Sequence, residues 1–179
     1  IVPDVLLSTD VTVEALTATR DEKRTYFMWE MGKPPELVIE LVSNREGEEL
    51  TKKRAKYGRA HVSSYVVFDP VGYLGGPPLR AFELRGDVLR PMPLAEGATS
   101  VRLETLGLGL TLWEGVFEDT HATWLRFVDA DGALLLTGDE LALREKTRAD
   151  EATARADEAT ARAAQLEARL RALGVDPDA

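Results

Sequence analysis

Short apolar runs alternate with polar breaks along the first seventy residues. The runs at 37–42 and 64–68 have the length and composition of buried strands, and an Asp-Pro pair stops the second. Residues 46–60 between them carry apolar positions at helical spacing and predict a helix, and residues 2–7 predict another short strand. A strand, a helix and a strand in this order predict a crossover unit in the mixed sheet of an α/β (α+β) fold.

The middle of the chain is typical of β-hairpins. Strand patterns at 79–84 and 88–92 flank an Arg-Gly-Asp triplet, which we interpret as a turn rather than a cell-adhesion signal, because any exposed turn can carry these residues. Strand patterns at 124–128 and 133–136 flank Asp-Ala-Asp-Gly. This segment lacks the closing glutamate of a calcium loop, so it also predicts a hairpin turn.

From about residue 137 the sequence changes to a seven-residue repeat, "RADEATARADEATARAAQLEARLRALG" at 148–174. Apolar residues recur at spacings of four and three, which is the a/d pattern of a coiled coil: Ala152, Ala156, Ala159, Ala163, Leu166, Leu170 and Leu173. We expect one domain at 1–136, a coiled-coil helix at 137–174 that forms a homodimer and ends at Gly174, and a tail at 175–179. The alternative is a single solvated helix.

Composition narrows the classes of function. The chain has 179 residues and no cysteine, which excludes disulfides and cysteine-bound zinc, and its two histidines lack metal-ligand spacing. No apolar run approaches the ~20 residues of a membrane span, and the composition fits a cytoplasmic protein. The net charge of −9 argues against binding of nucleic acid by the whole surface.

A local excess of basic residues lies within 45–60, where six basic and three acidic residues give six minus three, or +3. Lys52, Lys56 and Arg59 form an outward stripe of the expected helix and are weak candidates for binding nucleic acid. A solvated helix face would have the same composition.

Glu40 stands inside the apolar run at 37–42, on the same strand face as Val38 and Val42. Burying an ionised carboxylate is costly unless a charge or a metal compensates. Taken alone, Glu40 is better explained as a strand-end carboxylate that reaches water or an arginine. Asp4 also lies in an apolar segment, and the two acids can converge at one sheet edge with a divalent cation between them. We expect Mg²⁺, which prefers oxygen ligands, with Mn²⁺ as a substitute.

Lys53 is the third candidate. On the expected helix it shares a stripe with Leu50, Tyr57 and Ala60, whose composition indicates that this stripe faces the sheet. An inward lysine is expected to point at a negative group, although a pair with Glu49 one turn earlier would also explain it. Two acids and an inward lysine predict a metal-dependent hydrolase site.

The segments "VPDVLLS" and "WEMGKPPELVIELVSNREGEELTKKRAKYGRAHVSSYVVFDP" resemble the Uma-type restriction-endonuclease-like family, a branch of the PD-(D/E)XK nuclease superfamily. The segments "LGLGLTLWEG" and "WLRFVDADGALLLT" extend the resemblance to roughly residues 1–145. It implies a mixed central sheet flanked by helices, with added β-hairpins before the C-terminal helix. It also implies that Asp4 and Glu40 bind the metal, joined by the backbone carbonyl of Leu41.

The chain departs from the family pattern at its third element, usually a lysine two positions after the second acid, because this position is Val42. The departure is similar to an arrangement in which the following helix supplies the amine, so Lys53 is matched to it, with Lys52 as the alternative. Branch members often carry a further acid on an N-terminal helix, which we expect upstream of Ile1. His61 replaces an expected glycine and is interpreted as a helix stop.

The resemblance implies a Mg²⁺-dependent endonuclease that hydrolyses phosphodiester bonds in DNA. Asp4 and Glu40 would hold the metal while Lys53 assists the attacking water. The alternative is a catalytically inactive nuclease fold that serves binding or assembly through its coiled coil. The acidic net charge favours the alternative, whereas the coincidence of the three site residues favours the enzyme.

Overall fold

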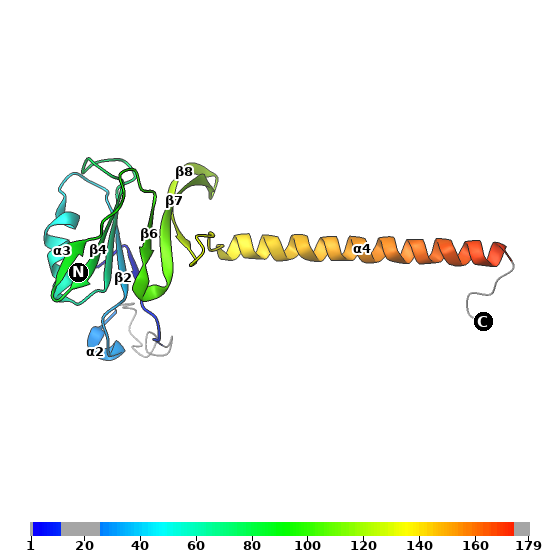
Figure 1. Ribbon diagram of the computed structural model, residues 1–179, viewed down its shortest axis with the longest axis horizontal. Helices are drawn as coiled ribbons and strands as arrows, with labels where there is room; N and C mark the ends of the chain where they lie inside the picture. The colour runs from blue at the N-terminus through cyan, green and yellow to red at the C-terminus, as the bar shows by residue number, and fades with distance from the viewer. Residues whose placement is uncertain (1, 12–25, 174–179) are drawn as a thin grey trace. The chain divides into compact units, whose positions relative to one another are not determined.

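The computed structural model describes residues 2–11 and 26–173, so the expected helix stop at Gly174 and the tail at 175–179 lie outside the described residues. The chain divides into two compact units, Ile1–Leu135 and Leu136–Ala179 (Figure 1). Each unit is described by itself.

A five-stranded mixed sheet forms the centre of the first unit. Its strands follow one another in chain order, β2 and β3 run parallel, and every other neighbouring pair is antiparallel. Helix α3 connects the parallel pair, which confirms the expected crossover unit. A one-turn helix, α2 (Met28–Met31), precedes β2. The strands are β1 (Val5–Leu7), β2 (Leu37–Leu41), β3 (Ser64–Phe68), β4 (Leu79–Arg85) and β5 (Val88–Pro91).

The crossover helix is shorter than the sequence predicts. Helix α3 spans Lys52–Arg59 and follows a separate 3₁₀ turn, η1 (Glu48–Leu50). The expected start at residue 46 is wrong because Gly47 is left-handed, with φ 69°, and Thr51 leaves the helical region at φ −122° and ψ −90°. His61 follows the helix at φ 57°, which confirms its reading as a helix stop.

The first strand is also shorter than expected, covering Val5–Leu7 rather than 2–7. Pro3 has no N–H to donate to a ladder. Asp4 leaves the strand pattern and accepts a hydrogen bond from the backbone N–H of Leu41.

A second, antiparallel sheet consists of β6 (Ser100–Leu103), β7 (Leu108–Phe117) and β8 (Thr120–Val128). A 3₁₀ turn, η2 (Glu104–Leu106), joins β6 to β7. The turn expected after residue 128 exists, because the Asp129 carboxylate accepts the N–H groups of Asp131 and Ala133. The hairpin expected there is limited to one bridge, Val128↔Leu134, and the main partner of β8 is β7.

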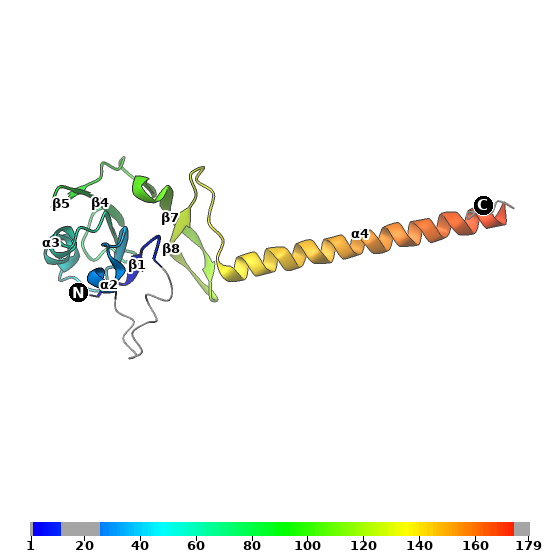
Figure 2. The same ribbon diagram turned by 90° about the horizontal axis from the view of Figure 1, so that it is seen from below.

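The central sheet lies between α3 and the second sheet (Figure 1). Leu37 and Ile39 face the second sheet and pack in a core with Val101 and Leu110. Val38 and Val42 face α3 and pack with Tyr57. Alternation along β2 therefore directs Glu40 toward α3, as the sequence predicts. Figure 2 shows the same elements after a quarter turn.

The second unit contains helix α4, Gly138–Ala172. A capping box starts it: the Thr137 hydroxyl accepts the Glu140 N–H, and the Glu140 carboxylate accepts the Thr137 N–H. No residue of α4 is buried. Among the described residues, no helix is long and apolar enough to cross a membrane. The two sheets, the short helices and the long C-terminal helix confirm the expected α/β class.

Candidate active site

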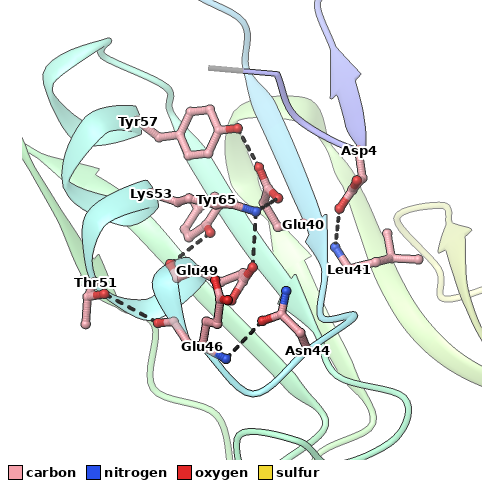
Figure 3. A network of polar contacts seen from close by, with 11 residues as sticks. Asp4, Glu40, Leu41, Asn44, Glu46, Glu49, Thr51, Lys53, Tyr57 and Tyr65 are labelled. Carbon is pink, nitrogen blue, oxygen red and sulfur yellow. Dashed lines mark hydrogen bonds and ion pairs between the residues drawn. The ribbon is translucent and has the colours of Figure 1, made fainter.

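Glu40 is fully buried at 0 % exposure on the α3 face of β2. Both of its carboxylate oxygens are hydrogen-bonded from the helix: the Lys53 amine donates to Oε2 at 2.7 Å and the Tyr57 hydroxyl donates to Oε1 at 2.5 Å (Figure 3). A charged donor, Lys53, and a neutral one, Tyr57, together offset the cost of removing the carboxylate from water. Glu40 is thus held in a fixed orientation inside the first unit.

Lys53 lies between two carboxylates. Its amine contacts Glu40 and also donates to Glu49 Oε1 at 3.1 Å. The inward orientation expected from the helix pattern is confirmed, and the alternative pair with Glu49 exists beside it. Burial lowers the pKa of the Lys53 amine, but the hydrogen bonds that it donates to Glu40 and Glu49 outweigh burial and raise this pKa beyond that of an ordinary lysine. Lys53 therefore carries its charge throughout the neutral range.

Tyr57 of α3 and Tyr65 of β3 pack in one apolar cluster between the helix and the sheet, next to Glu40 and Glu49. Burial raises the pKa of the Tyr57 phenol, and its hydrogen bond to Glu40 raises it further. Burial likewise raises the pKa of Tyr65, whose hydroxyl donates to the Glu49 backbone carbonyl at 2.9 Å. Both phenols are neutral hydrogen-bond donors, so Tyr57 orients Glu40 without adding a competing charge.

Asp4 reaches the site from β1. The register pairs Val5 with Ile39, so the residues next in line are Asp4 and Glu40. Asp4 is exposed, and its Oδ2 accepts the Leu41 N–H at 2.7 Å, which fixes the carboxylate beside the backbone that follows Glu40 (Figure 3). The negative charge of Asp4 also contributes to the raised pKa of Tyr57. The fold thus brings an exposed acid close to the buried one.

Glu49 also belongs to this cluster of polar groups. The sequence indicates it only as a possible partner of Lys53. It is 6 % exposed, and its second carboxylate oxygen is buried without a hydrogen-bond partner. Position 49 lies in η1 rather than in a continuous helix. Its position one turn before Lys53 places it on the same side as that lysine, but only the folded structure shows that its carboxylate is buried.

The outward stripe of α3 is exposed as expected at Lys52, Lys56 and Arg59. Lys52 pairs with Glu48 at 2.5 Å, which reduces the excess of positive charge counted from the sequence. The position that the family pattern assigns to lysine, Val42, is 3 % exposed and belongs to the apolar cluster with Tyr57. The amine of this site comes from the helix instead.

Asp4, Glu40 and Glu49 supply carboxylate oxygens, which are the donor atoms that hard divalent cations prefer. Three carboxylates and the Lys53 ammonium leave a formal charge of −2, and one buried Glu49 oxygen has an unused acceptor. Within residues 2–11 and 26–173, no three or more aspartate, glutamate, histidine or cysteine side chains are grouped so that they could hold a metal ion together. Mg²⁺ does not need such a group, because it commonly binds one or two carboxylates together with waters and substrate phosphates.

Comparison with known proteins identifies a family. The Uma2 family model, described as "Putative restriction endonuclease", matches residues 1–113. No curated protein and no solved structure matches the chain significantly. The matched span is more than half of the 179 residues and includes β1, β2 and α3 with the acids and the lysine described above. The chain therefore belongs to the Uma2 family of restriction-endonuclease-like proteins.

Proposed function

We propose that this protein is a metal-dependent endonuclease that hydrolyses phosphodiester bonds in DNA. The observation that carries the proposal is the buried contact of 2.7 Å between Glu40 and Lys53, with Asp4 hydrogen-bonded to the adjacent residue of β2. A carboxylate and an ammonium placed together on the inner face of a crossover unit resemble the acid and amine that the nuclease superfamily requires.

Asp4, Glu40 and the Leu41 carbonyl are the proposed ligands of Mg²⁺ or Mn²⁺. When bound, such an ion neutralises phosphate charge and lowers the pKa of a coordinated water. The protein's own contribution is positional. Tyr57 and Lys53 hold the Glu40 carboxylate from two sides, so its orientation does not change when a substrate arrives.

Lys53 acts as a cation in this proposal, not as a general base. Burial lowers the pKa of its amine, but the hydrogen bonds to Glu40 and Glu49 raise it beyond that of an ordinary lysine, so Lys53 keeps its proton at neutral pH and can only donate hydrogen bonds. Two of its three N–H groups can serve Glu40 and Glu49, and the third can orient the attacking water or contact the developing negative charge on phosphate.

Substrate contact is assigned to the exposed stripe of α3. Lys52, Lys56 and Arg59 are accessible, and cationic side chains bind nucleic acid through phosphate. Because Lys52 already pairs with Glu48, its contribution is smaller than its charge suggests. The contact is therefore weak and sensitive to salt.

A second candidate function, a catalytically inactive binding or assembly module, is favoured by one observation. Glu40 and Lys53 satisfy each other, and Tyr57 occupies the second Glu40 oxygen, so the group also has the contacts of a structural buried ion pair. In this alternative the acids bind no metal and the fold only presents a surface.

A cleavage assay with a metal-binding measurement separates the two functions. Full-length protein is incubated with plasmid and single-stranded DNA plus Mg²⁺ or Mn²⁺, alongside Asp4→Asn, Glu40→Gln and Lys53→Ala. Each change should lower kcat by about 10²-fold or more, as the loss of one preorganised transition-state contact does. Titration calorimetry with Mn²⁺ should show weaker binding for the two acid variants alone.

Lys52→Ala is the matched control for Lys53→Ala, because the neighbouring amine contacts Glu48 rather than Glu40. It should retain kcat and lower only DNA affinity. Intact folding of every variant is checked by tryptophan fluorescence. Bound Mn²⁺ without cleavage of any substrate, or equal losses for the two lysine variants, would contradict the catalytic assignment.

Self-association is proposed as well. The apolar seam from Ala152 to Leu173 is exposed along α4, and a second copy of the helix would cover it.

A further inference from the structure

Helix α4 carries an apolar seam with unequal flanks. Taking the seam as heptad positions a and d leaves positions e and g beside it. Position g is arginine in four successive heptads, whereas position e holds two threonines and a glutamate. The g residues are Arg148, Arg155, Arg162 and Arg169, and the e residues are Thr153, Thr160 and Glu167.

The flanks decide the orientation of a partner helix. In a parallel pair of identical helices, each g residue faces the e residue of the next heptad on the partner, so Arg162 of one copy meets Glu167 of the other, and the preceding arginines meet threonines. In an antiparallel pair, g faces g, and arginine would oppose arginine along the whole seam. Repulsion of this kind persists when the helices shift by one heptad or more within the repeat, because all four g positions from 148 to 169 are arginine.

We propose that α4 pairs with a second copy of itself as a parallel, in-register coiled coil. The inference rests on the self-association proposed above but not on catalysis. The alanine half of the seam admits only a closely approaching helix, and the leucine half supplies most of the apolar area. Pairs within one helix, Arg155–Glu151 at 3.2 Å and Arg171–Glu167 at 3.5 Å, are exposed and therefore weak enough to exchange for contacts with the partner.

The parallel orientation has a consequence for the proposed nuclease. Each α4 begins at Gly138, directly after the first unit. A parallel pair therefore attaches both copies of the first unit to the same end of the coiled coil, where two sites can act on one DNA molecule. An antiparallel pair would attach them at opposite ends, separated by about 1.5 Å for each helical residue.

Disulfide crosslinking tests the orientation directly, because the chain has no cysteine of its own. Ala152→Cys and Leu170→Cys place single thiols at both ends of the seam, eighteen residues apart (170 minus 152) and thus ~27 Å along the helix. Ala161→Cys, on the outer stripe, is the matched control. The full-length variants are equilibrated singly and in a one-to-one mixture in a glutathione redox buffer.

Each seam variant should crosslink to itself at least about tenfold more than the Ala161→Cys variant, because paired seams raise the local thiol concentration. The mixture should contain almost no crosslink between position 152 and position 170. A predominant mixed crosslink would show an antiparallel pair and overturn the proposal. Crosslinking no greater than that of the control, together with a monomeric mass in light scattering, would show a solvated single helix and overturn it too. Neither result depends on whether the protein cleaves DNA.

Discussion

Glu40 is held by two donors of different chemistry, an ammonium and a phenol. The Tyr57 hydroxyl donates to a fully buried carboxylate, whereas the Tyr65 hydroxyl donates to a neutral backbone carbonyl. Hydrogen bonds to charged groups contribute more to stability than those between neutral groups. We therefore expect the Tyr57 hydroxyl to contribute more to the free energy of unfolding than the Tyr65 hydroxyl, although the two rings pack together.

This difference predicts the result of removing each hydroxyl. Tyr57→Phe should lower the free energy of unfolding by about 1.5–3 kcal/mol, and Tyr65→Phe by about 0.5–1.5 kcal/mol. Urea unfolding followed by tryptophan fluorescence measures both, because all three tryptophans lie in the first unit. An equal or larger loss for Tyr65→Phe would contradict the assignment of Tyr57 as the principal support of Glu40.

The same groups predict a loss of stability at alkaline pH. The pKa values of Tyr57, Tyr65 and Lys53 are all raised on folding, so their contribution is complete below pH ~10 and declines as pH rises above it. Tyrosinate absorbance should therefore contain a component that appears only as the first unit unfolds. Tyr57→Phe combined with Tyr65→Phe should remove that component. If it persisted in the double variant, the burial of these phenols would be wrong.

At the scale of elements, α3 and α4 are stabilised in different ways. Helix α3 is eight residues long and is held by the sheet through Tyr57 and the buried Gly58. Helix α4 has no buried residue, so its stability within one chain depends on propensity, charge pairs and its N-terminal capping box. A cap should therefore have a measurable effect on α4.

Thr137→Ala removes the hydroxyl that accepts the Glu140 N–H and should destabilise the first turn of α4 by about 1 kcal/mol. Thr147→Ala is the matched control, because this threonine lies inside the helix, where alanine is preferred by up to ~0.7 kcal/mol. Amide hydrogen exchange should become faster in the first turn for Thr137→Ala and slower around residue 147 for the control. A change in the same direction in both variants would exclude a capping effect.

At the scale of the whole molecule, α4 offers a surface for self-association. The leucines exposed on α4 are apolar surface that a second copy of the helix would cover. Association through α4 would link the first unit of one copy to the first unit of the other.

Light scattering tests this association in the full-length chain. Leu166→Glu combined with Leu170→Glu places charges in the seam and should convert a dimer to a monomer. Ala161→Glu combined with Ala168→Glu adds the same charge on the outer stripe and should leave the dimer intact. If both pairs gave the mass of the unaltered chain, the seam would not be the interface.

The sequence alone was sufficient to predict features that depend on residues close together in the chain. Alternation along residues 37–42 directed Glu40 to one face of β2, and the spacing of Leu50, Lys53 and Tyr57 directed the lysine toward the sheet, since the periods of strand and helix fix which side chains share a face. The family motifs lie within the same segments. The parallel pairing of β2 with β3 also followed, because a strand, a helix and a strand have few ways to pack.

Tertiary structure decided what depends on residues far apart or on local departures from regular structure. It placed Asp4 against Leu41, thirty-seven positions away, and paired β8 with β7 where the sequence suggested a later hairpin. It also showed that Glu49, one turn before Lys53, is buried with one carboxylate oxygen left without a hydrogen-bond partner. Periodicity specifies the face on which a side chain lies, but only the packing of distant segments specifies which groups meet there.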